Sequence, residues 1–140
     1  MPFLSEKQRS YLEREHPSVY ARFIRDERRM GFQLKAPPEV AVIAKRGLDL
    51  RREYRRGGTI VGATRANQLA KREVVSIDTV KRMVEYFDRH EIDLSAPAAK
   101  PGHPDYPSPG RIAWDLWGGN AGRAWAKRQL AVWNRVQKAN

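Results

Sequence analysis

The 140-residue chain contains no cysteine, which excludes disulfide bonds, thiolate zinc sites and cysteine nucleophiles. It also has no long hydrophobic run, so we expect neither a signal peptide nor a membrane-spanning helix. The three histidines, His16, His90 and His103, are scattered and do not have the spacing of metal ligands. No set of catalytic residues stands out. We therefore expect no metal and no cofactor, and we interpret the protein as a non-enzyme.

Acidic residues are few relative to basic ones. The chain has 16 Asp and Glu against 27 Lys and Arg, which gives a formal net charge of +11. A protein this basic typically meets a polyanion, either nucleic acid or an acidic protein surface. With 41% hydrophobic residues the chain can bury a modest core.

Helical periodicity recurs along the chain, and no segment shows the alternation of a strand. The pattern predicts a compact all-α domain of about six or seven short helices, with a helix-turn-helix-like pair and a proline-rich connection. We divide the chain into a helical hairpin (1–35), a helical core containing the pair (36–93), a proline-rich linker (94–110) and tryptophan-rich C-terminal helices (111–140).

The segment from Gln68 to Met83 is typical of a helix-turn-helix. Val75 is the expected apolar plug after the turn, and Ser76 is the expected N-cap of a helix that runs from Ile77 to His90. Such turns usually contain a glycine where this chain has Val74. The same pattern also suits helix packing without DNA, so nucleic-acid binding does not follow from the motif alone.

Capping and breaking signals mark the other helix ends. We expect Ser5 and Gly31 to bound the N-terminal hairpin, and Gly57-Gly58 to stop a helix that begins near Glu39. Five prolines between Leu94 and Gly110 exclude regular structure there. Beyond them, Ser108-Pro109 opens a helix and Asn120 is the expected cap of the last one.

Two segments resemble proteins of tailed bacteriophages. The first carries Met1-Pro2-Phe3, Ser5, Gln8-Arg9, Tyr11-Leu12, Pro17 and Ala21-Arg22-Phe23. The second extends from Gly47 to Arg123 and includes the run Ile112-Ala113-Trp114-Asp115-Leu116-Trp117-Gly118-Gly119. The first resembles the opening of small phage proteins of unknown function, and the second resembles a phage-associated module that occurs alone or attached to phage structural and assembly proteins. The resemblance implies a phage or prophage origin and no particular biochemical activity.

A dense arginine cluster is the strongest candidate for contact with phosphates. It comprises Arg51, Arg52, Arg55 and Arg56, just before the double glycine, and Arg65, Lys71 and Arg72 are candidates to extend it. Neutralising several phosphates would release counterions and make binding salt-sensitive. The alternative is a solvated helix face on which Asp49 and Glu53 supply local partners.

The second helix of the pair offers Lys81 and Arg82 as contacts to base edges or phosphates. Against this, Asp78 with Arg82, Lys81 with Glu85, and Glu85 with Arg89 have the spacing of ion pairs on a solvated helix face. The four tryptophans suit a stacking platform for single strands. Their helical spacing favours a core position instead.

Together these features predict a basic phage protein that binds nucleic acid, DNA foremost, mainly through backbone phosphates. The alternative is a virion structural or assembly component that binds an acidic capsid or portal surface. The expected location is the host cytoplasm or, for a virion component, the phage particle.

Overall fold

The structure is a computed structural model that describes residues 6–29 and 34–139, and in this part the chain is entirely helical apart from turns. Its α-helices are α1 (Glu6–Glu15), α2 (Pro17–Arg29), α3 (Pro38–Tyr54), α4 (Ile60–Ala70), α5 (Ile77–His90), α6 (Pro109–Leu116) and α7 (Gly119–Ala139). Two short 3-10 helices, η1 (Glu91–Ser95) and η2 (Pro97–Ala99), follow α5. Among the described residues the only β pairing is an isolated bridge between Lys35 and Val74. The all-α prediction is confirmed.

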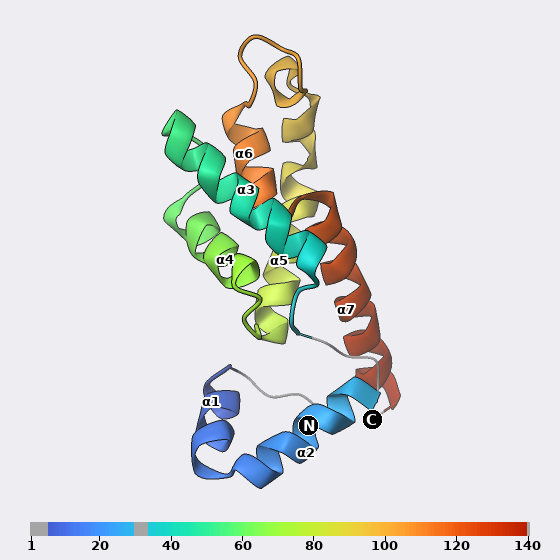
Figure 1. The fold of residues 1–140 in the computed structure, drawn as a ribbon. Coiled ribbons are helices and arrows are strands. Elements are labelled where there is room, and N and C mark those ends of the chain that lie inside the picture. Colours follow the sequence, from blue (N-terminus) through green and yellow to red (C-terminus); the bar gives the residue numbers. More distant parts are fainter. Residues whose placement is uncertain (1–5, 30–33, 140) are drawn as a thin grey trace.

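Five helices form a bundle, and the N-terminal hairpin of α1 and α2 lies at one end of it (Figure 1). Helix α3 packs against α4 and α6, while α5 packs along α7. Helices α1 and α2 pack mainly against each other. The largest fully buried core side chains come from α3 to α6 and include Phe87, Leu69, Met83, Ile112 and Leu116.

Local signals set several helix starts as the sequence predicts. The Ser76 hydroxyl accepts a hydrogen bond from the Thr79 N–H, and the Ser108 hydroxyl accepts one from the Arg111 N–H. Each serine thereby satisfies one of the N–H groups that a helix start leaves unpaired. Helix α5 has the predicted bounds. The predicted ends at Ser5 and Gly31 lie outside the described residues.

The turn between α4 and α5 is closed by an arginine rather than a glycine. Arg72 adopts φ 53°, the left-handed conformation for which a glycine would normally be chosen. Its Nε donates to the Ala36 carbonyl oxygen at 2.9 Å, which ties the turn to the segment before α3. Val75 is 1% exposed, so its predicted role as the apolar plug is confirmed.

The predicted stop of α3 at Gly57-Gly58 is wrong by a few residues. The helix ends at Tyr54, because Arg55 turns left-handed with φ 52°. The two glycines instead shape the loop that follows, with φ 90° and 76°. A Cβ on Gly57 would lie 2.7 Å from the Ile112 Cβ, and one on Gly58 would lie 2.4 Å from the Leu116 Cδ1. Glycine therefore lets this loop lie directly on α6.

Two predictions about the C-terminal third need correction. The proline-rich connection contains the end of η1 and all of η2, and η2 tolerates Pro97 because the first position of a helix needs no N–H donor. Asn120 does not cap the last helix, which begins at Gly119. Its Oδ1 accepts a hydrogen bond from the Trp114 Nε1 at 3.0 Å instead.

The tryptophans belong mainly to the core. Trp114, Trp117 and Trp125 are buried, and Trp133 is half-buried on α7. The core prediction is therefore confirmed for three of the four rings. Within the described residues, no helix combines the length and apolar character needed to cross a membrane.

Candidate nucleic-acid interface

The arginine-rich end of α3 and the loop after it enclose a small open cavity. It is lined by Arg51, Arg55, Arg56, Gly57 and Gly58, and its volume is about 360 Å³. We call it the arginine cavity. No carboxylate is among these lining residues, so the positive charge around the cavity has no partner in its wall. Such a concavity favours an anionic ligand.

Two of its three arginines are held in place by main-chain carbonyls. Arg51 Nε donates to the Gly57 oxygen at 3.1 Å. Arg56 Nη2 donates to the Asp105 oxygen at 3.2 Å and to the Pro107 oxygen at 2.9 Å. These bonds fix the guanidinium groups while leaving further N–H groups on each, since one guanidinium carries five.

The cluster predicted from the sequence has four arginines, and the remaining two, Arg52 and Arg55, are more open to solvent. Arg52 has a side chain that is 81% exposed and lies 3.8 Å from Asp49, a contact of little strength at the surface. It does not line the cavity. Arg55 lines the cavity and is exposed.

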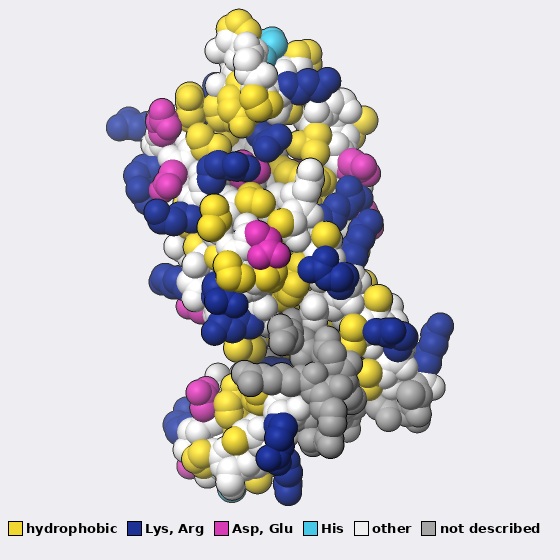
Figure 2. All heavy atoms as spheres, turned by 45° about the vertical axis from the view of Figure 1, so that its right-hand side comes forward, with side chains coloured by type: hydrophobic (Ala, Val, Ile, Leu, Met, Phe, Trp, Pro, Cys, Tyr) yellow, Lys and Arg dark blue, Asp and Glu magenta, His cyan; other side chains and the backbone are white. Residues whose placement is uncertain are grey.

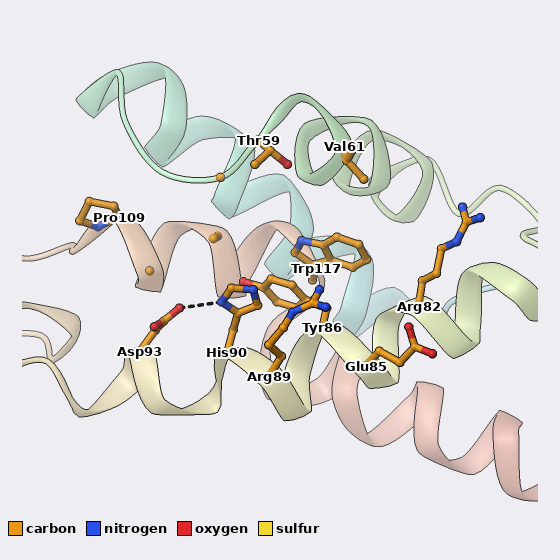
Figure 3. Close-up of a pocket in the computed structure, with 13 residues that line it drawn as sticks. Thr59, Val61, Arg82, Glu85, Tyr86, Arg89, His90, Asp93, Pro109 and Trp117 are labelled. Atoms are coloured by element: carbon orange, nitrogen blue, oxygen red, sulfur yellow. Dashed lines mark hydrogen bonds and ion pairs between the residues drawn. The ribbon is translucent and has the colours of Figure 1, made fainter.

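A second, larger cavity lies between α4 and α5, with α6 behind it (Figure 3). Its volume is about 540 Å³, and its lining includes Gly58, Thr59, Arg82, Tyr86, His90 and Trp117. We call it the aromatic groove. Gly58 lines both the groove and the arginine cavity, so the two hollows meet at this residue.

Stacked rings form one wall of the groove. Tyr86 lies between Trp117, with a centroid distance of 4.5 Å, and His90, with a distance of 4.7 Å. The guanidinium of Arg65 covers the ring of Trp117 at 5.5 Å. Both faces of Tyr86 are therefore occupied, so this ring offers no free face for stacking.

Tyr86 also carries an unused hydrogen-bonding group. It is 6% exposed, and its hydroxyl oxygen has no hydrogen-bond partner among the described residues. Burial, with the nearby Asp93 carboxylate, raises the pKa of Tyr86, so the phenol stays protonated. Beside Tyr86, His90 Nδ1 and Asp93 Oδ2 are 2.9 Å apart, as the dashed line in Figure 3 marks.

The ion pairs predicted along α5 do not form. No contact within 4 Å joins Asp78 to Arg82, Lys81 to Glu85, or Glu85 to Arg89, residues that the structure describes in full. Lys81 Nζ instead lies 5.4 Å from the centre of the Trp133 ring. Arg82 and Arg89 line the groove, and the Arg82 side chain extends from α5 toward α4 (Figure 3). The expectation of a salt-bridged face is thus wrong, and two arginines remain open to a ligand.

Three residues named from the sequence do not line either cavity. Arg65 is 7% exposed and hydrogen-bonds Gln68 and Thr79, so it cannot extend the surface patch. Burial also lowers the pKa of Arg65. Arg72 is engaged with Ala36, and Lys71 lies exposed at the end of α4, outside both cavities. These positions could not be separated by sequence because all three are basic residues of one segment.

Elsewhere, basic residues are neutralised within the protein. Arg123 on α7 contacts Asp88 at 2.9 Å and Glu91 at 3.4 Å, and Lys127 lies 3.9 Å from Asp88. We call these four residues the paired face. The hydrogen bonds that Arg123 donates to the Glu91 and Asp88 carboxylates raise the pKa of Arg123. Lys and Arg side chains are spread over the whole length of the face in Figure 2, so their exposure alone does not mark a site.

A buried ion cluster inside the bundle is structural. Asp115 is 0% exposed and lies 3.3 Å from Arg46 and 3.5 Å from Arg111. Burial raises the pKa of Asp115, and the two arginines oppose that shift. Among the described residues, no group of three His, Asp or Glu is placed to hold a metal ion.

Comparison of the chain with protein-family models, with curated proteins and with solved structures gives no match. The functional argument therefore depends on the geometry of the two cavities and on the charges around them.

Proposed function

We propose that this protein binds nucleic acid, DNA foremost, mainly through backbone phosphates. The observation that carries the proposal is the meeting of the two cavities at Gly58. One cavity is lined by Arg51 of α3 and by Arg55 and Arg56 just after it, and the other by Arg82 and Arg89 of α5. These residues are distant in sequence, yet they line two cavities that share Gly58.

Phosphate contact suits this arrangement better than reading of bases. Guanidinium groups match phosphate oxygens in geometry, and neutralised phosphates release counterions. A recognition helix would need its exposed side chains free to reach base edges. On α5, however, Lys81 is engaged with Trp133. We therefore propose binding with low sequence preference.

The direct test is a titration of the full chain with fluorescent duplex and single-stranded DNA of mixed sequence. The proposal expects binding at physiological salt and a linear fall of log affinity against log salt, with a slope of about 0.7–0.9 per phosphate contact. Binding that appears only at very low salt, with equal loss for every basic residue changed, would contradict a defined interface.

A virion component that binds an acidic protein surface remains the second candidate, and one observation favours it. Ile60 and Val61, at the start of α4, are 81% and 58% exposed, and Val61 lines the aromatic groove. Exposed apolar side chains beside a hollow are typical of protein contact. The resemblance of the sequence to phage proteins supports a phage origin for either function. Detection in purified particles, together with no DNA binding, would favour this candidate.

A further inference from the structure

We propose that the arginine cavity binds the terminal phosphate of a nucleic-acid strand, a phosphate monoester, rather than an internal phosphodiester. This inference rests on the proposed function and specifies its ligand. It concerns the hollow lined by Arg51, Arg55, Arg56, Gly57 and Gly58.

The charge of the wall favours a dianion. Three guanidinium groups and two glycines line the cavity, and no carboxylate is among them. The acids nearest in sequence, Asp49 and Glu53, are not part of the wall. A phosphate monoester near neutral pH carries close to two negative charges, whereas an internal diester carries one. The doubly charged monoester is therefore attracted more strongly by the three guanidinium groups than the diester is.

The arginines are also held in place before any ligand arrives. Arg51 is fixed by the Gly57 carbonyl, and Arg56 by the carbonyls of Asp105 and Pro107. Because these side chains are already ordered, binding an anion costs less conformational entropy. Arg55 has no such anchor and can close onto the ligand. The wall is thus prepared for hydrogen bonds to phosphate oxygens.

The size of the cavity leaves room for more than the phosphate. A hollow of about 360 Å³ is larger than a phosphate group alone, so the attached sugar can also be accommodated. Gly58 lines both this cavity and the aromatic groove, so the groove offers a path for the rest of the strand. The preference for a terminal phosphate therefore rests on the charge of the wall and on its ordered arginines.

The test uses one single-stranded oligonucleotide sequence with a 5′-phosphate, a 3′-phosphate or hydroxyls at both ends, titrated into the full chain. We expect one phosphorylated form to bind about tenfold more tightly than the hydroxyl form, the usual effect of an added charge-assisted contact. Arg55→Gln should abolish this preference. Arg52→Gln removes the same charge one turn away but outside the cavity, and should weaken all three forms equally.

Each outcome separates this inference from the general function. Equal binding of the three forms at physiological salt would overturn the inference and leave phosphate-backbone binding intact. Binding of phosphorylated forms alone would support the cavity and contradict backbone binding. Equal loss of the preference in both variants would also overturn the inference.

A second measurement does not depend on nucleic acid. Inorganic phosphate titrated into the wild-type chain should shift the amide NMR signals of Gly57 and Gly58 saturably. Arg55→Gln should abolish the shift, and Arg55→Lys, which keeps the charge but not the planar fork, should weaken it. Unchanged amide signals in the wild-type protein would overturn the proposal. A native spectrum elsewhere in each variant shows that its fold is retained.

Discussion

The arginine cavity and the paired face contain the same kind of side chain in opposite electrostatic situations. On the paired face, Arg123 and Lys127 lie within 4 Å of Asp88 or Glu91. Around the arginine cavity, guanidinium groups are held by neutral carbonyls, and no carboxylate lines the wall. The paired face therefore satisfies its charge internally, whereas the cavity still attracts an external anion.

This difference shows why the density of basic residues does not by itself locate a binding surface. The net charge of +11 belongs to the whole chain, yet only part of it is available to a ligand. Whether a guanidinium group can bind a ligand depends on the partner that it contacts in the folded protein. Arg65 illustrates the point, since it is buried against Trp117 although it lies close in sequence to the exposed cluster.

The largest expected effect is a loss of overall stability, which should disrupt the arginine cavity and the paired face together. Trp114 is 2% exposed, and the Arg123 guanidinium lies 5.8 Å from the centre of its ring. Trp114→Ala should lower the free energy of unfolding by about 3–5 kcal/mol, the usual cost of such a cavity in a core. Urea unfolding measures it. Trp133→Ala, at a half-buried position, is the control and should cost less. Unchanged stability with lost DNA binding would make Trp114 a contact residue instead.

A smaller effect should disturb the arginine cavity and spare the paired face. Gly58→Ala combines positive φ with a clash against Leu116, and should lower the free energy of unfolding by about 2–4 kcal/mol. Gly102 also has positive φ, but a Cβ added there would have nothing within 4 Å. Gly102→Ala is therefore the matched control, and it should lower the free energy of unfolding by about 1 kcal/mol. Thermal unfolding compares them. Equal losses would show that strain alone acts and that contact with α6 does not shape the loop.

The smallest expected effect is on DNA affinity, and it compares two basic residues of α5, Arg82, which is free, and Lys81, which is engaged. Arg82→Gln should weaken DNA binding roughly threefold for every sequence, as the loss of one phosphate contact. Lys81→Gln should have less effect because Lys81 lies over Trp133. Titrations with several unrelated sequences measure both. If either variant instead removes discrimination between sequences, α5 reads bases and the phosphate interpretation is wrong.

The sequence predicts those parts of the fold that depend on neighbouring residues. Helix α5 has the predicted bounds because Ser76 caps it and a regular apolar stripe, including Val80 and Met83, faces the core. The burial of Trp114 follows from the same periodicity. These features need no knowledge of distant contacts.

The candidate site depends on contacts between distant segments and could be predicted only in part. The cluster at the end of α3 was visible as a run of arginines, and Arg51, Arg55 and Arg56 do meet in one cavity. The anchoring of Arg56 by Asp105 and Pro107 depends on where the proline-rich segment folds back. The aromatic groove, with the role of Arg89 at its rim, depends on the placement of α4 beside α5.

The central claim is that unpaired arginines, and not total charge, bind nucleic acid. Two double variants test it, because each removes two positive charges from the chain: Arg55→Gln with Arg56→Gln in the arginine cavity, and Arg123→Gln with Lys127→Gln on the paired face. Fluorescence titrations with duplex DNA over a range of salt should show a slope of log affinity against log salt that is lower by about two units in the first variant. In the second variant the slope should match that of the wild type. Equal slopes in the two variants would contradict the account.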